Sequence, residues 1–159
     1  MFYSNVARPR AKFQLWLLFM GRLATKDRLT RFGVKLEKSC TFCLEDESID
    51  HLFFSCRKTN TIWQTILQWI GYSRTRRQWS EEKRWLIQES NRKGWKRQLL
   101  KVALAETIYF LWKARNDHIF NQIDIGSELT SSIKTSIVTR SSLSKHLRGH
   151  VNVGNMSIS

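Results

Sequence analysis

Residues 40–56 of the chain read CTFCLEDESIDHLFFSC, and this stretch contains every cysteine of the protein. Cys40, Cys43, His51 and Cys56 form a C-x2-C-x7-H-x4-C pattern. Three thiolates and one imidazole complete the tetrahedral ligand set of a structural Zn²⁺ site, with no coordination position left for water or substrate. The pattern therefore predicts a closed zinc site that stabilises a fold and performs no chemistry itself.

Other interpretations of the same residues are weaker. A disulfide is disfavoured because the cysteine count is odd and no cleavable secretory signal is seen, which indicates a reducing compartment, the nucleus or the cytoplasm. A redox pair at Cys40 and Cys43 is disfavoured because no strand-to-helix turn accompanies it. A lone histidine is commonly a core residue, but His51 is flanked by cysteines at ligand spacing and is therefore predicted to bind the metal.

The charge of the chain is strongly positive and unevenly distributed. Its 159 residues include 27 Lys and Arg against 13 Asp and Glu, a net charge of +14. Residues 1–38 carry nine bases and two acids, residues 39–70 two bases and four acids, and residues 71–101 ten bases and three acids. Two basic segments thus flank an acidic metal loop, and this excess favours a polyanionic partner, RNA or DNA.

The basic flanks supply the candidate nucleic-acid contacts. The acidic residues between Cys43 and His51, together with a thiolate-rich zinc cluster, should repel phosphate, so contact is expected on the flanks and not on the metal loop. The candidates are Arg8, Arg10, Lys12, Arg22, Lys26, Arg28 and Arg31 on one side, and Arg74, Arg76, Arg77, Lys93, Lys96 and Arg97 on the other.

Two further classes of protein are disfavoured. No apolar run approaches the ~20 residues that span a bilayer, so an integral membrane protein is not expected. A hydrolase would need an open metal site or a carboxylate cluster. The acids between Cys43 and His51, which are Glu45, Asp46, Glu47 and Asp50, are instead predicted to form a solvated loop.

Hydrophobic periodicity predicts a mainly α fold. Phe13, Trp16, Leu17 and Met20 recur at helical spacing and predict a core helix that Gly21 ends. A second helix is expected from a Thr25 N-cap to Gly33, with Leu29 and Phe32 facing the core. A third is expected to start at Thr59 or Asn60 and to end at Gly71, with Trp63, Ile66, Leu67 and Ile70 facing the core. Further helices are expected to start at Ser80, to run from Trp95 to Phe120, and to lie around Leu129 to Val138.

These elements suggest a division of the chain. The prediction is a small helical domain at residues 1–71 built around the metal loop, and a basic connector with a short helix at 72–94. A longer helical extension is predicted at 95–146, with a disordered tail at 147–159.

Several pieces in order resemble the zinc-binding domain that follows the polymerase in reverse transcriptases of plant non-LTR retrotransposons. They are Phe13-x-x-Trp16-Leu17, Gly21-Arg22-Leu23-x-Thr25-Lys26-Asp27-Arg28-Leu29, Cys40-x-x-Cys43, Glu47-Ser48-x-x-His51-Leu52-Phe53-Phe54-x-Cys56 and Ile62-Trp63. The segment 108–120 is similar to a helix that often follows this domain. Ala24 and Arg57 stand where proline is usual and Gln14 where an aromatic is frequent, but no ligand is lost.

The resemblance implies a zinc-binding accessory domain without catalytic activity. The paired aspartates of a polymerase and the acidic set of a ribonuclease H are not seen, so the chain is expected to be a stand-alone remnant of a longer reading frame. It is expected to bind RNA or DNA through its basic flanks. The alternative is a protein interaction module that docks on a reverse transcriptase or ribonucleoprotein partner.

Overall fold

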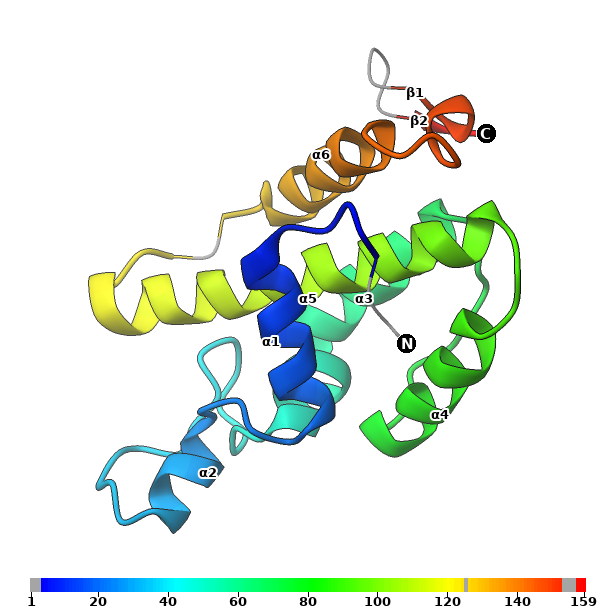
Figure 1. The fold of residues 1–159 in the computed structure, drawn as a ribbon. Helices are drawn as coiled ribbons and strands as arrows, with labels where there is room; N and C mark the ends of the chain where they lie inside the picture. The colour runs from blue at the N-terminus through cyan, green and yellow to red at the C-terminus, as the bar shows by residue number, and fades with distance from the viewer. Residues whose placement is uncertain (1–3, 125, 153–156) are drawn as a thin grey trace.

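The computed structural model describes residues 4–124, 126–152 and 157–159, and it is predominantly helical (Figure 1). The mainly α fold predicted from the sequence is confirmed. Its elements are α1 (Pro9–Phe19), α2 (Lys26–Arg31), a short π-helix η1 (His51–Ser55), α3 (Arg57–Trp69), α4 (Trp79–Ser90), α5 (Trp95–Asn121), α6 (Leu129–Ser142), a 3-10 turn η2 (Arg148–His150), and the two-residue antiparallel strands β1 (Val151–Asn152) and β2 (Ser157–Ile158).

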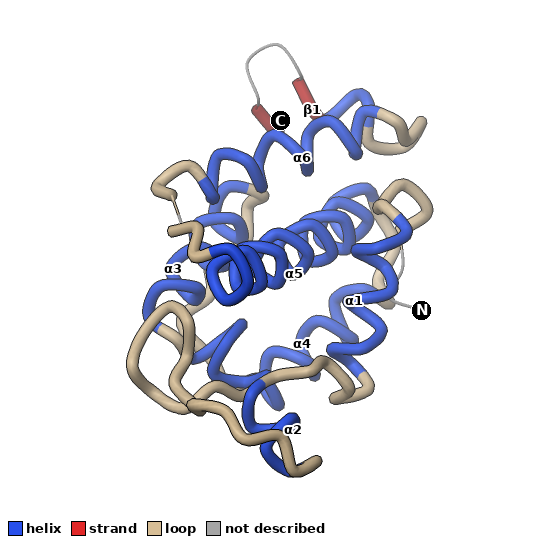
Figure 2. Tube along the Cα trace, turned by 90° about the vertical axis from the view of Figure 1, so that its left-hand side faces the viewer, coloured by secondary structure: helices blue, strands red, loops and turns tan. Residues whose placement is uncertain are grey.

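Helix α5 is the centre of the molecule. It packs against α1, α3, α4 and α6, and Figures 1 and 2 show α6 on one side of it with α1 and α4 on the other. Its residues from Leu99 to Leu104 are all buried, and Ile108 and Leu111 continue the buried surface. The helix predicted from Trp95 to Phe120 is confirmed, and one core cluster includes side chains from both halves of the chain.

Most of the predicted helix ends are observed. Gly21, Gly33 and Gly71 follow helices with φ of +64°, +85° and +88°, a region that glycine enters without steric cost. The predicted starts are less accurate. Helix α3 begins at Arg57 with Cys56 as N-cap, and neither Thr59 nor Asn60 caps it. Residues 57–60 already form the first turn of α3, so Cys56, the last predicted metal ligand, is also the N-cap of this helix.

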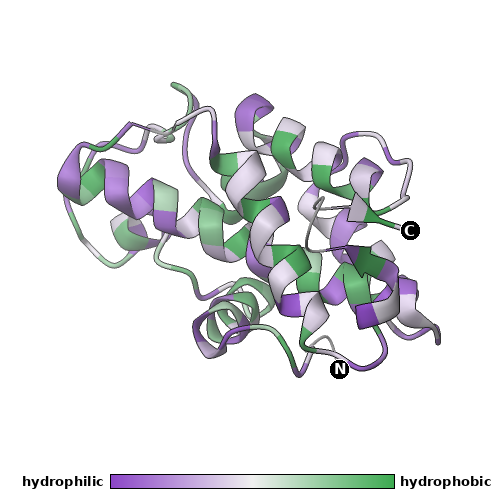
Figure 3. Cartoon of the chain, turned by 90° about the horizontal axis from the view of Figure 1, so that it is seen from above, coloured by the Kyte–Doolittle hydropathy of each residue, from purple (hydrophilic) through white to green (hydrophobic). Residues whose placement is uncertain are grey.

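The predicted buried face of α1 is wrong for three of its four residues, since only Leu17 packs partly against the core. Ala11, Leu15 and Leu18 are its buried residues, whereas Phe13, Trp16 and Met20 are 59%, 38% and 52% exposed. Apolar residues occur all around this helix, so periodicity alone could not choose the face that α5 covers. Elsewhere hydrophobic and hydrophilic positions are interleaved along the helices, as Figure 3 shows.

A similar error concerns the end of α2. Phe32 was expected inside, but its side chain is 71% exposed and lies beside the guanidinium of Arg28. The helix is only six residues long and buries none of its own residues. A helix this short depends on its contacts with the metal loop, and not on an apolar face of its own.

The two faces of α1 give a direct test of the packing. Leu15→Ala should lower the free energy of unfolding by about 2–5 kcal/mol, because it leaves a cavity under α5. Phe13→Ala should change it by no more than about 0.5–1 kcal/mol, since the ring is mostly exposed. Urea unfolding followed by circular dichroism measures both. An equal loss in the two variants would contradict the observed orientation of α1.

The predicted division of the chain stays a prediction. Of the tail at 147–159, residues 153–156 lie outside the described part; within the rest, Leu147 is buried and His150 stacks on Trp95 with ring centroids 3.9 Å apart. Among the described residues, no helix combines the length and apolarity needed to cross a bilayer.

Candidate metal centre

The four predicted ligands converge on one point. Cys40, Cys43, His51 and Cys56 each offer one ligand atom, and these atoms all lie within 4.8 Å of one another. Cys40, His51 and Cys56 are buried and Cys43 is half-buried. The cluster forms between the loop before η1 and the start of α3, so its members come from a turn and from both ends of one short helix.

Backbone hydrogen bonds shape the turn that holds the first two cysteines. The Cys40 N–H donates to the Glu45 carbonyl at 2.6 Å, and Ser39 and Asp46 form an antiparallel bridge beside it. The Phe42 N–H donates to the Cys40 sulfur at 3.4 Å. An N–H aimed at sulfur stabilises the thiolate over the thiol, which suits a metal ligand.

His51 is held in a definite orientation. Its backbone N–H donates to the Ser48 hydroxyl at 3.1 Å, and its Nε2 lies 3.0 Å from the Cys43 sulfur. Its Nδ1 lies 3.4 Å from a carboxylate oxygen of Glu45. A carboxylate on the outer nitrogen is the usual partner of a metal-bound histidine, because it fixes the ring and raises its basicity. Glu45 is thus a supporting residue of the centre, a role that its place in the predicted solvated loop did not indicate.

The thiols have unequal acidities. The Cys40 thiol donates to the Cys56 sulfur, and this bond, together with the Thr59 and Lys58 N–H groups at the start of α3, lowers the pKa of Cys56 to about 4. The same shared proton and burial raise the pKa of Cys40, and burial raises that of Cys43. Cys56 is therefore the cysteine that ionises most readily, and binding of a metal ion would release protons from the cluster.

Two acids of the metal loop anchor it to the rest of the protein, so the prediction of a wholly solvated acidic loop is wrong. Glu47 is fully buried, and its carboxylate lies 2.6 Å from the guanidinium of Arg115 on α5. It also accepts the Lys26 N–H at 2.9 Å at the start of α2. Asp50 accepts hydrogen bonds from the Trp79 N–H and the Ser55 hydroxyl.

The predicted nucleic-acid residues fall into two groups. Ten of the thirteen already have a partner on this chain: Arg8, Lys12, Lys26, Arg28, Arg31, Arg74, Arg76, Arg77, Lys96 and Arg97. Arg10, Arg22 and Lys93 are exposed, and their side chains form no hydrogen bond, ion pair or ring contact with any described residue.

The ligand set fits a tetrahedral metal ion. Zinc–sulfur bonds of about 2.3 Å place ligand atoms roughly 3.5–4 Å apart, and the observed upper limit of 4.8 Å is compatible with that spacing. Three soft sulfurs with one imidazole favour zinc over hard cations such as magnesium or calcium. All four positions are filled by protein, so the centre can hold a metal ion but leaves no site for a reacting water.

The comparisons agree with this geometry. Residues 1–63 match a family model described as zinc-binding in reverse transcriptase. The match covers all four clustered residues and ends at Trp63, within α3. No curated protein and no solved structure matches the chain. The matched family is thus one of zinc-binding domains, and the segment that carries the match is the one that builds the centre.

Proposed function

We propose that this chain is a non-catalytic zinc-binding module of a reverse transcriptase, of the kind found in plant non-LTR retrotransposons. The observation that carries the proposal is the convergence of Cys40, Cys43, His51 and Cys56 within the segment that matches the family model. The zinc ion would be structural, holding the loop before η1 against the start of α3. A closed site of this kind stabilises a fold and activates no water.

The module would bind RNA or DNA through its basic flanks. Arg10, Arg22 and Lys93 support this part best, because they are exposed and have no partner within the described residues. The ten basic residues that already have a partner on this chain support nucleic-acid binding less, since a phosphate would in general have to compete with an existing contact. The net charge of +14 favours a polyanion, and phosphate contacts of this type carry no sequence specificity.

The salt dependence of binding tests the nucleic-acid part. If about five side chains contact phosphates, the logarithm of the affinity should fall with the logarithm of salt with a slope of about −3.5 for single strands to −4.5 for duplex DNA. A triple variant with Arg10, Arg22 and Lys93 changed to Gln should flatten the slope by about 2–3. Filter binding across a salt series measures both. A wild-type slope near zero would reject phosphate contact.

A protein interaction module is the second candidate function. The exposed side chains of Phe13, Trp16 and Met20 favour it, because Phe13 and Trp16 stack on the outer face of α1 with ring centroids 5.9 Å apart. Such a face would suit docking on a polymerase or ribonucleoprotein. An electrophoretic mobility shift at physiological salt separates the two functions, since only the first requires a shifted nucleic acid.

A further inference from the structure

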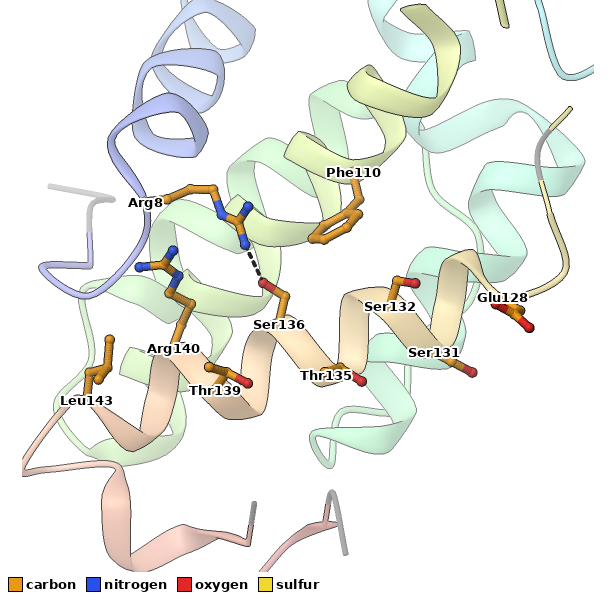
Figure 4. A pocket seen from close by; sticks show the side chains of 10 residues that line it. All are labelled: Arg8, Phe110, Glu128, Ser131, Ser132, Thr135, Ser136, Thr139, Arg140 and Leu143. Carbon is orange, nitrogen blue, oxygen red and sulfur yellow. Dashed lines mark hydrogen bonds between the residues drawn. The ribbon is translucent and has the colours of Figure 1, made fainter. Parts of the chain in front are cut away.

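A pocket of about 730 Å³ lies between the start of α1, the middle of α5 and one face of α6 (Figure 4). Its volume is in the range of roughly 300–1,000 Å³ that small-ligand sites have. The α6 wall is rich in hydroxyl groups, Phe110 supplies an aromatic ring, and Arg8 and Arg140 lie together at one end. The pocket is remote in sequence from the metal centre, and of its lining only Arg8 belongs to the matched segment.

Arg8 is held in place at this end of the pocket. Its guanidinium lies 3.0 Å from the carboxylate of Glu106, which is fully buried, and donates to the Ser136 hydroxyl at 2.7 Å. It also lies over the Tyr109 ring at 4.6 Å. A quarter of the side chain is still exposed, and its buried Nε has no acceptor among the described residues. The hydrogen bond and the ion pair both use Nη2, so Arg8 is a fixed cation whose Nη1 keeps its donors for a ligand.

Arg140 adds a second positive charge beside it. The side chain is half-buried and forms no hydrogen bond or ion pair with any residue that the structure describes. Glu106 offsets the charge of Arg8, while the acid that lines the pocket, Glu128, lies at its opposite end (Figure 4). This end of the pocket therefore carries a positive charge that no described acid neutralises.

An anion between the two arginines would remove that imbalance. Guanidinium groups bind phosphate through paired hydrogen bonds, and the neighbouring hydroxyls offer more donors. The volume is larger than a bare phosphate needs, and the ring of Phe110 faces the pocket. Aromatic rings that stack on bases are a standard feature of single-strand binding sites.

We propose that this pocket holds one nucleotide of a bound RNA or DNA strand, with its phosphate at Arg8 and Arg140 and its base against Phe110. The inference rests on the proposed nucleic-acid binding and assigns it a specific place. It adds Arg140 and Phe110, neither of which belongs to the basic flanks.

Arg140→Gln is the sharpest test, because the side chain has no structural partner to lose. The matched control is Arg84→Gln, which removes the same charge from an exposed arginine on α4. Fluorescence anisotropy with oligothymidylate and oligouridylate of about 12 nucleotides should show R140Q weakened at least fivefold relative to R84Q, with a salt slope flatter by about 1. Phe110→Leu should weaken binding roughly fivefold or more without changing the slope.

The outcomes separate this inference from the proposed function. If the wild type binds the strands and R140Q equals R84Q, the pocket assignment is overturned and nucleic-acid binding stands. In a second titration, uridine monophosphate is added to the protein and its binding is monitored by NMR chemical shifts. If the wild type binds the mononucleotide but no strand, and R140Q loses that binding, the pocket is a nucleotide site and the proposal that it holds part of a nucleic-acid strand is rejected. A wild type that binds neither probe overturns both.

Discussion

Cys56→Ser should abolish stoichiometric zinc binding and produce the largest loss of stability of any single change in the protein. Cys56 is fully buried and is both a member of the cluster and the N-cap of α3. Serine is itself a good N-cap, so the helix start is preserved and the loss reports the metal. We expect a loss of several kcal/mol, below the ~10–16 kcal/mol of isolated finger peptides, because the helices packed on α5 bury apolar side chains of their own and should keep part of their structure without the ion.

Native mass spectrometry of protein purified under reducing conditions gives the metal content, and thermal unfolding with and without chelator gives the stability. Chelator should lower the unfolding midpoint of the wild type and leave that of C56S unchanged. Leu44→Ser is a suitable control, because Leu44 lies in the same loop and is 94% exposed. A C56S protein that retains one equivalent of zinc would show that the cluster is not the metal site.

Arg115→Met should lower the free energy of unfolding by about 3–5 kcal/mol, the usual result of removing one partner from a buried ion pair. The Arg115 side chain is 5% exposed and the Glu47 side chain is fully buried. The variant leaves a buried carboxylate without its counter-charge. Urea unfolding measures the change.

A second variant identifies the cause of that loss. Glu47→Gln combined with R115M removes both charges and keeps an acceptor for the Lys26 N–H, so it should recover part of the stability. Arg31→Met is the matched surface control: its pair with Asp27 is exposed, and the expected cost is about 0–1 kcal/mol. An R115M protein as stable as R31M would mean that the pair contributes nothing beyond a surface contact.

Much of the fold could be predicted from the sequence because its signals are local. Gly71 ends α3 where the apolar stripe from Trp63 to Ile70 ends, and the strong pattern after Trp95 gives the central helix. The face of α1 could not be predicted in the same way. Leucines and aromatics compete for burial around that helix, and the choice between them depends on α5, which lies far along the chain.

The candidate site follows the same rule. The four clustered residues lie within one short segment and share a spacing that metal chemistry restricts. The residues that support the cluster are not connected to it by any such spacing. Arg115 is 68 residues from Glu47, and no spacing rule connects a buried arginine to a loop carboxylate at that distance. Glu45 was visible in the sequence, but its role depends on the direction of the His51 ring.

The pair between Glu47 and Arg115 also bears on how the protein is made. The four residues of the metal centre have all been translated once residue 56 is added, whereas Arg115 follows 59 residues later. At roughly 5–20 residues per second, a ribosome needs about 3–12 s to cover that interval. A nascent chain can therefore capture its ion while Glu47 still faces water, and the loaded loop docks on α5 only after that helix emerges.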